Sequence, residues 1–434
     1  MRVKLSFAGI NLSFTLFERS GDIYAAAETG TLSRVPPDLL TEQALTKIEN
    51  GYAPIHVAAM LGYLNQIPEE RLTPAVMIAP SIDSLNALHY AARNHNLHQV
   101  PKSLLTPKIL GDRTLADWTP AHEIAAAGDI GLVPKSSLTE EILTSSSATA
   151  SSADSPSDRI NEPASPRSRV ALPATSRSVI ELCMWNGSVA AIPSSMLTPG
   201  VMNAQTCSLG ASAMHIVAEL GCWDSIPADS VTDETAFLED ERGRTPLHYA
   251  AKEGKLREVP AKLFMQASVM HLNEWGETPL HNAALGGHIS QIPLQFLTRG
   301  NLSSRDGFAG KSAYHYAARS GTLGDLPSTV LGRDDLLVGD NEGMTPLHEA
   351  ATAKMLDAVP RGIVKMEDLD VRGEYQVSVQ TLADFHGCGL QARRLSGYNL
   401  QKAIASMDSL PAEPQTGPPT PMSELLEKVR RGYD

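Results

Sequence analysis

A histidine recurs along this chain at a nearly fixed spacing, and that spacing limits what the chain can fold into. The best-formed copies read TPLHYAA around His248, TPLHNAA around His281 and TPLHEAA around His348. Successive histidines lie 33 residues apart, except for one step of 34 and one long gap. Such a period is typical of solenoids, in which each repeat stacks on its neighbours. The histidines are His56, His89, His122, His215, His248, His281, His315 and His348.

A proline twelve residues after each histidine supports the same register. This proline also identifies two degenerate copies, in which Tyr24 and Glu181 occupy the histidine position. We therefore predict ten repeats, followed by a decayed partial copy near the sequence VQTLADFHGCG. The prolines are Pro36, Pro68, Pro101, Pro134, Pro193, Pro227, Pro260, Pro293, Pro327 and Pro360.

The full copies resemble the ankyrin repeat, whose pattern is a Gly-x-Thr-Pro-Leu-His turn followed by two alanines, a helix-ending glycine and an apolar second helix. The match is strongest from Gly243, Gly276 and Gly343, and the resemblance covers roughly residues 20–390. Thr caps the first helix, and Pro occupies its first turn, where a missing N–H costs nothing. The resemblance implies an all-α, ankyrin-like solenoid of about ten 33-residue helix–turn–helix repeats.

The second half of each repeat departs from the ankyrin pattern. Where that family has an uninterrupted second helix, this chain reads Leu-x-x-Ile-Pro-x-x-x-Leu-Thr, as in LNQIPEERLT before Pro74. Proline inside a helix costs about 3 kcal/mol, so a proline at a fixed register marks a helix start. We predict a turn before the proline, a short helix after it, and a brief helical turn that begins at Thr73-Pro74, Thr106-Pro107 or Thr198-Pro199.

Two stretches interrupt or follow the repeats. Residues between Leu143 and Val179 are rich in serine and proline and lack aromatic residues, which predicts disorder. The spacing makes this segment an insertion between adjacent repeats, so we expect one continuous solenoid with a protruding loop. The predicted organisation is an N-terminal cap (1–22), repeats 1–4 (23–144), a disordered insertion (145–178), repeats 5–10 with a degenerate last repeat (179–393), and a Pro-rich C-terminal tail (394–434).

Charge and cysteine usage restrict the class of protein. The net charge of -13 in 434 residues argues against general nucleic-acid binding, which needs a basic face. Four unevenly spaced cysteines favour a reducing compartment over a disulfide framework. The first 17 residues have the basic start and apolar middle of a signal peptide, but Asn11, Ser13 and Thr15 interrupt the apolar stretch. We expect a monomeric, cytoplasmic protein that contacts neither membrane nor nucleic acid.

The resemblance to ankyrin repeats implies that the repeated histidine hydrogen-bonds backbone groups between repeats. Its recurrence argues against catalysis, because a catalytic residue is needed once. His348-Glu349 and His122-Glu123 begin like a zinc-protease helix, but Thr352 and Ala126 stand where the second histidine belongs. The sequence has neither a Gly-x-Ser-x-Gly elbow nor a phosphate-binding loop. We therefore predict a protein with no catalytic activity, no metal site and no cofactor.

The resemblance indicates where a partner would bind. In ankyrin arrays the turn tips and the exposed side of the first helix line a concave face. In this register those positions hold Tyr52, Trp118, Glu241, Arg242, Arg244, Lys252, Glu274, Trp275, Glu277, Phe308, Lys311, Arg319, Asn341 and Met344. Exposed aromatic residues and arginines dominate protein interfaces. The predicted partner-binding residues are Tyr52, Trp118, Arg242, Arg244, Trp275, Phe308, Lys311 and Arg319.

These observations favour a module that binds an unknown protein partner on its concave face. We expect Trp275 and Phe308 to lie side by side on consecutive tips, with Arg244 and Arg319 flanking them toward the groove. The alternative for each ring is that it covers a contact between neighbouring loops. An effector that binds host proteins and a structural scaffold are alternative functions for the same array.

Overall fold

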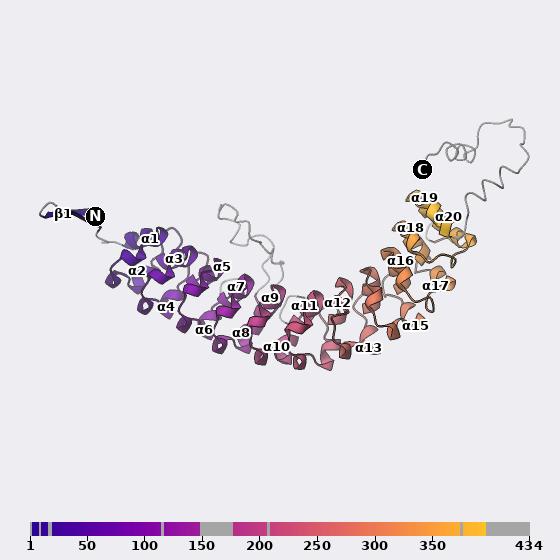
Figure 1. Ribbon diagram of the computed structural model, residues 1–434, viewed down its shortest axis with the longest axis horizontal. Helices are drawn as coiled ribbons and strands as arrows, with labels where there is room; N and C mark the ends of the chain where they lie inside the picture. Colours follow the sequence, from indigo (N-terminus) through magenta and orange to yellow (C-terminus); the bar gives the residue numbers. More distant parts are fainter. Residues whose placement is uncertain are drawn as a thin grey trace, which may run out of the picture.

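The computed structural model describes residues 2–7, 10–15, 20–113, 117–147, 177–205, 209–373 and 376–395. Helices from Ser20 to Leu395 form a single stack that curves into an arc (Figure 1). Most of the predicted insertion (145–178) and of the predicted Pro-rich tail (394–434) lies outside the described residues.

The first α-helix of each repeat lies on the concave side of the arc (Figure 1). Each of these helices packs against the corresponding helix of the next repeat. They are α1 (Ser20–Glu28), α3 (Pro54–Leu61), α5 (Ala87–Arg93), α7 (Pro120–Ala127), α9 (Val179–Trp185), α11 (Ala213–Leu220), α12 (Pro246–Glu253), α14 (Pro279–Leu285), α16 (Ala313–Ser320) and α18 (Pro346–Thr352).

Local sequence fixes both ends of these helices. Thr278 caps α14 by accepting a hydrogen bond from the backbone N–H of His281, and Pro279 occupies the first turn. Ala283 and Ala284 are fully buried, which lets neighbouring helices approach closely. The helix α12 ends at Gly254, whose φ of 69° lies in the left-handed region that glycine adopts at low cost.

The second half of each repeat lies on the convex side and is broken into short pieces (Figure 1). A single α-helical turn or slightly longer helix closes most repeats, and a 3₁₀ helix does so in two of them. These closing elements are α2 (Glu42–Thr46), α4 (Pro74–Met77), α6 (Pro107–Leu110), α8 (Glu140–Thr144), α10 (Pro199–Asn203), η14 (Asp233–Phe237), α13 (Gln266–Val269), α15 (Arg299–Leu302), α17 (Arg333–Leu337) and η20 (Met366–Asp370).

Short 3₁₀ helices stand on either side of the repeated proline. They are η1 (Leu32–Arg34), η2 (Pro37–Leu39), η3 (Leu64–Gln66), η4 (Glu69–Arg71), η5 (Leu97–Gln99), η6 (Lys102–Leu104), η7 (Ile130–Leu132), η8 (Lys135–Ser137), η10 (Ser188–Ala191), η11 (Ser194–Met196), η12 (Trp223–Ser225), η13 (Ala228–Ser230), η15 (Ala261–Leu263), η16 (Ile289–Gln291), η17 (Leu294–Phe296), η18 (Leu323–Asp325) and η19 (Leu356–Ala358).

The proline explains why the second helix is broken. Pro68 has an extended ψ of 135° and caps η4, while the preceding turn η3 ends at Ile67. Proline has no N–H to continue the hydrogen-bond ladder, so the chain must restart its helix there. The threonine that follows then caps the closing element, as Thr73 does for α4. These features confirm the predicted all-α, ankyrin-like solenoid with a broken second helix.

Further elements precede and follow the ten repeats. The strands β1 (Arg2–Phe7) and β2 (Ile10–Thr15) pair antiparallel ahead of the first repeat, an addition that the all-α prediction did not include. After the last full repeat, α19 (Val379–Phe385) packs on α18, and α20 (Gly389–Leu395) packs on α19. The helix α19 coincides with the decayed copy recognised in the sequence.

Contacts across residues 148–176 join the two halves of the repeat array. The helix α7 packs against α9 in the same way as neighbouring first helices do elsewhere. The side-chain amide of Asn186 donates a hydrogen bond to the carbonyl of Ala125. Ser146 and Ser178 form an antiparallel bridge, and the Ser147 N–H donates to the carbonyl of Arg177. The array therefore stacks without a break through this junction.

Candidate protein-interaction surface

The repeated histidines connect neighbouring repeats. In His281 the Nδ1 atom accepts a hydrogen bond from the backbone N–H of Thr278 at 3.0 Å, so Nε2 must carry the ring proton. That Nε2–H donates to the carbonyl of Ser304 at 2.9 Å. The other seven histidines also bond a backbone carbonyl 23 or 29 residues further along through Nε2. This confirms the predicted hydrogen bonding between repeats.

Burial keeps these imidazoles neutral. Desolvation lowers the pKa of His89 to about 3 and those of His122, His215 and His248 to about 4. Nδ1 now accepts a hydrogen bond from a backbone N–H. A proton added at Nδ1 would point at that N–H, and the hydrogen bond would be lost. Each ring nitrogen thus makes a hydrogen bond with a backbone group.

The turn tips are linked to one another by backbone hydrogen bonds. The N–H of Glu274 donates to the carbonyl of Arg242 at 2.9 Å, and that of Gly307 donates to the carbonyl of Trp275 at 2.8 Å. In the next pair of tips, the N–H of Asn341 donates to the carbonyl of Ala309 at 2.9 Å. Consecutive tips therefore form a ladder that fixes the spacing of the side chains they present.

Each of these tips is also closed from inside by a buried polar side chain. Oδ1 of Asp240 accepts hydrogen bonds from the N–H groups of Arg242 and Arg244, at 2.9 and 2.8 Å. Asn273, Asp306 and Asp340 close the following tips in the same way. Sequence reasoning missed these residues, although an Asp or Asn shortly before a glycine is a known turn signal.

Two predicted aromatic residues are exposed on this ladder. The side chain of Phe308 is 85% exposed, and that of Trp275 is 37% exposed. The side-by-side placement of these two rings on one rim stays a prediction. Arg242 lies over the Trp275 ring, with its guanidinium carbon 5.5 Å from the ring centroid.

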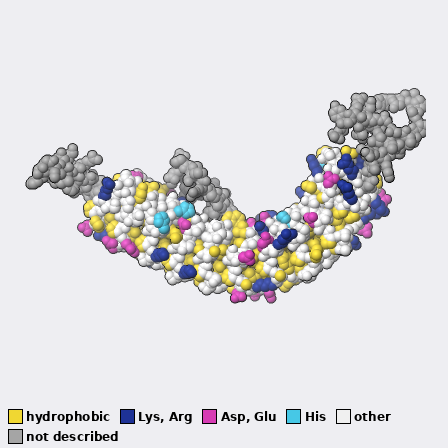
Figure 2. Space-filling model, viewed as in Figure 1, with side chains coloured by type: hydrophobic (Ala, Val, Ile, Leu, Met, Phe, Trp, Pro, Cys, Tyr) yellow, Lys and Arg dark blue, Asp and Glu magenta, His cyan; other side chains and the backbone are white. Residues whose placement is uncertain are grey.

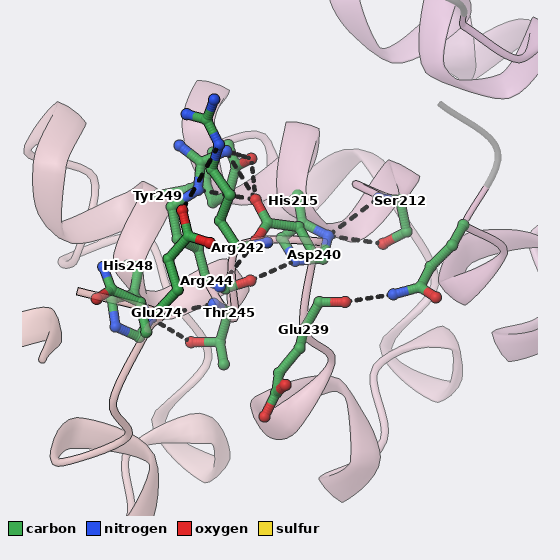
Figure 3. Close-up of polar contacts among 12 residues, drawn as sticks. Ser212, His215, Glu239, Asp240, Arg242, Arg244, Thr245, His248, Tyr249 and Glu274 are labelled. Carbon is green, nitrogen blue, oxygen red and sulfur yellow. Dashed lines mark hydrogen bonds and ion pairs between the residues drawn. The ribbon is translucent and has the colours of Figure 1, made fainter. Parts of the chain in front are cut away.

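Arg244 turns inward rather than toward a partner. Its guanidinium donates to Oδ2 of Asp240 and to the hydroxyl of Tyr249, at 2.8 and 2.7 Å, and it lies over the Tyr249 ring (Figure 3). The Tyr249 hydroxyl donates to the same carboxylate at 2.9 Å. Burial alone would raise the pKa of Asp240, but these hydrogen bonds and the Arg244 charge hold it below its usual value. The network positions the tip.

Another set of charges comes from the first helices α16 and α18 and from Lys311, which precedes α16. Lys311 makes an ion pair with Glu349 at 2.6 Å, and Arg319 approaches the same carboxylate at 3.9 Å. The Arg319 side chain remains 60% exposed. Figure 2 shows basic and acidic side chains together in the middle of the concave edge, over α12 and its neighbours. The face therefore carries charges of both signs.

Tyr52 and Trp118 lie apart from the other predicted residues, in the N-terminal part of the arc. The Tyr52 hydroxyl donates to Asp83 at 3.3 Å, and its ring meets Tyr90 edge-on at 5.8 Å. The Trp118 ring stacks near His122 at 4.9 Å. Both side chains are partly buried against the core, and that of Tyr52 contacts the following repeat. The structure thus brings together the predicted residues from 242 to 319 only.

A search of the residues that the structure describes finds no helix both long and apolar enough to cross a membrane. The same residues contain no group of three or more His, Cys, Asp or Glu arranged to hold a metal ion.

Comparison with known proteins identifies the repeat. Residues 214–306 match the family model of ankyrin repeats in three copies. These residues include α12, α14 and all of α11 but its first residue, with the histidines of the three helices, and the tips at Arg242 and Trp275. No curated protein matches the chain. Residues 214–306 are therefore ankyrin repeats, and the same helices and histidine bonds continue on both sides of this matched segment.

Proposed function

We propose that this chain is a non-catalytic module that binds a partner protein across its turn tips and concave face, centred on residues 242–319. The observation that carries the proposal is the exposed pair of rings on the hydrogen-bonded tip ladder. Trp275 and Phe308 occupy consecutive tips, yet neither ring is needed to bury the core. Exposed aromatic residues beside arginine are typical of the centres of protein interfaces.

Rigidity of the tips favours binding. The tip at Trp275 is held by Asn273 from inside and by the Gly307 N–H from the next repeat. A surface that is already ordered loses little conformational entropy when a partner binds. The aromatic groups would therefore contribute most of their burial energy to affinity.

The charges around these rings indicate an amphipathic partner segment. Arg244 and Lys311 are already paired with Asp240 and Glu349, so a purely acidic partner would meet few unpaired cations. Arg242 and Arg319 stay exposed at the border of the aromatic groups. A segment with an apolar side for the rings and polar groups for this border matches the surface.

Affinity capture with the full chain, followed by titration of the retained protein, tests this function. We expect the double variant Trp275→Ala with Phe308→Ala to weaken binding by at least about 2 kcal/mol, or roughly thirtyfold in Kd. The control Leu294→Ala removes an apolar side chain that is 74% exposed, from η17 on the convex side, and should leave Kd unchanged. A folded double variant that binds like the unchanged chain would refute the proposed surface.

A further inference from the structure

A small pocket opens on the concave face beside the tip at Arg244. Its volume is about 260 Å³, and α9, α11, α12 and α14 all contribute lining residues. Leu209, Ala211 and Ile216 provide an apolar part of the lining, and Tyr249 provides an aromatic one. Sites for drug-sized ligands usually measure about 300–1,000 Å³, so this pocket suits a single side chain.

Two hydrogen-bond acceptors in this pocket lack a partner. The carboxylate of Glu219 on α11 makes no hydrogen bond or ion pair within the described residues. The Oδ1 atom of Asn282 is buried and has no hydrogen-bond donor among the described residues, and the residue is only 7% exposed. A buried acceptor left without a donor costs about 1–3 kcal/mol. Such a cost is recovered when a ligand supplies the missing donor.

The cations that line the pocket already have partners. Arg244 is bound by Asp240 and Tyr249, and Lys252 lies 3.7 Å from Glu253. Arg177 has a buried Nε without an acceptor, but its guanidinium lies 4.9 Å above the Trp185 ring, which stabilises the charge. The polar groups of the pocket that still lack a partner are therefore mainly acceptors, and a positively charged hydrogen-bond donor would suit them.

We propose that this pocket binds a basic side chain of the partner segment, with Glu219 and Asn282 accepting its hydrogen bonds. The inference rests on the proposed function, since the partner supplies that side chain. The apolar lining would contact the aliphatic stem of a lysine, and the Glu219 carboxylate would hold its ammonium group. Glu253, at the end of α12, also lines the pocket, but it is already paired with Lys252.

The electrostatics of Glu219 agree with a missing cation. Burial raises the pKa of this carboxyl, and the nearby charge of Glu253 raises it further, against the opposing effects of Arg177, Lys252 and Arg244. An ammonium group placed beside it would stabilise the ionised form and lower the pKa again. Binding of a basic side chain is therefore expected to release protons at pH values near that pKa.

The side-chain amide of Asn282 reports directly on the pocket. Its signals in a nitrogen–proton correlation spectrum of the full chain are assigned by their loss in Asn282→Ser. The probe is the blocked peptide acetyl-Gly-Lys-Gly-amide, and the comparison is acetyl-Gly-Glu-Gly-amide. We expect the lysine peptide to shift the Asn282 signals in a saturable way and the glutamate peptide to leave them in place. No shift, or an equal shift with both peptides, would overturn the proposal.

A matched pair of variants attributes the effect to the carboxylate. Glu219→Gln keeps the size of the side chain but removes its charge, and should raise the Kd of the lysine peptide about tenfold. Glu258→Gln removes the same charge from an exposed position outside the pocket and should leave that Kd within about twofold, because exposed charges contribute little. Equal effects of the two substitutions would mean that only the net charge of the chain attracts the peptide.

Titration of a captured partner separates this inference from the proposed function. If Glu219→Gln leaves the affinity for the partner unchanged while the Trp275 and Phe308 double variant loses it, the pocket assignment fails and the function stands. If neither substitution changes the affinity, both fail. Loss of affinity in both variants, with melting curves unchanged, supports both.

Discussion

At the scale of single residues, the repeated histidine acts as a link between backbones. Each imidazole accepts a hydrogen bond from a backbone N–H at the start of its own helix and donates one to a backbone carbonyl further along the chain. His281 does so between Thr278 and Ser304. Repetition argued against a catalytic role, and the resemblance to ankyrin repeats implied this linking role. The partner of Arg244 was not, because a repeat register shows that a side chain stands near the groove but not which neighbour it bonds.

His281→Ala removes both hydrogen bonds of one such link and leaves buried backbone groups without partners. We expect a loss of roughly 1–3 kcal/mol in the free energy of unfolding, measured by urea denaturation of the full chain. The matched control is His98→Ala, which removes an imidazole from an exposed position and should change stability by less than about 0.5 kcal/mol. Equal losses in the two variants would refute the linking role.

The buried histidines should make stability depend on pH. Their pKa values are lowered to about 3 or 4 in the folded chain at His89, His122, His215 and His248, against about 6.5 when unfolded. The unfolded chain therefore binds more protons below pH 6.5, and stability should fall as the pH drops from 6.5 toward 4. Urea denaturation at pH 7.5 and pH 5, in enough salt to screen the net charge, measures this. Constant or rising stability at pH 5 would contradict it.

At the scale of elements, the positions of proline and threonine made the broken second helix predictable. Pro68 stops one 3₁₀ turn and starts the next, and Thr73 caps α4. The β1–β2 hairpin was missed, although its residues alternate between apolar and polar, as in Val3, Leu5 and Phe7. The basic start and apolar middle of the same stretch also fit a targeting signal, and this composition obscures the period of two.

The tip ladder gives a test at the same scale. Gly276 and Gly362 both have a positive φ, of 69° and 84°, so alanine strains the backbone at either site. A Cβ at Gly276 would meet the backbone N of Gly307 in the neighbouring tip, whereas a Cβ at Gly362 meets nothing within 4 Å. We expect Gly276→Ala to lower the thermal midpoint by clearly more than Gly362→Ala. Similar midpoints would show that the tips do not depend on close backbone contact.

At the scale of the whole molecule, stability comes from interfaces between neighbouring repeats. The junction between α7 and α9 is one of these interfaces, closed by the Ser146–Ser178 bridge. Replacing residues 148–176 by Asn-Gly, which suits a two-residue hairpin turn, should leave the urea midpoint unchanged because every contact across the junction described here is retained. A large loss of stability would show that the replaced residues contribute contacts to the array.

The sequence also indicated which half of the arc to examine, since its best-formed turns lie between His248 and His348. It did not indicate the pocket beside Glu219, because that pocket depends on how α9, α11, α12 and α14 are spaced. The absence of a donor for Asn282 is likewise a property of packing. Contacts between repeats, rather than the pattern within one repeat, determine the fine structure of this surface.

Hydrogen exchange of the full chain, with and without a captured partner, tests the central claim most directly. If the partner covers the tips and first helices, exchange should slow in peptides that contain residues 241–253, 274–285 and 306–319, and stay unchanged in the convex elements η17 and α15. Slowing confined to the convex elements, or to the N-terminal repeats around Tyr52, would contradict the account.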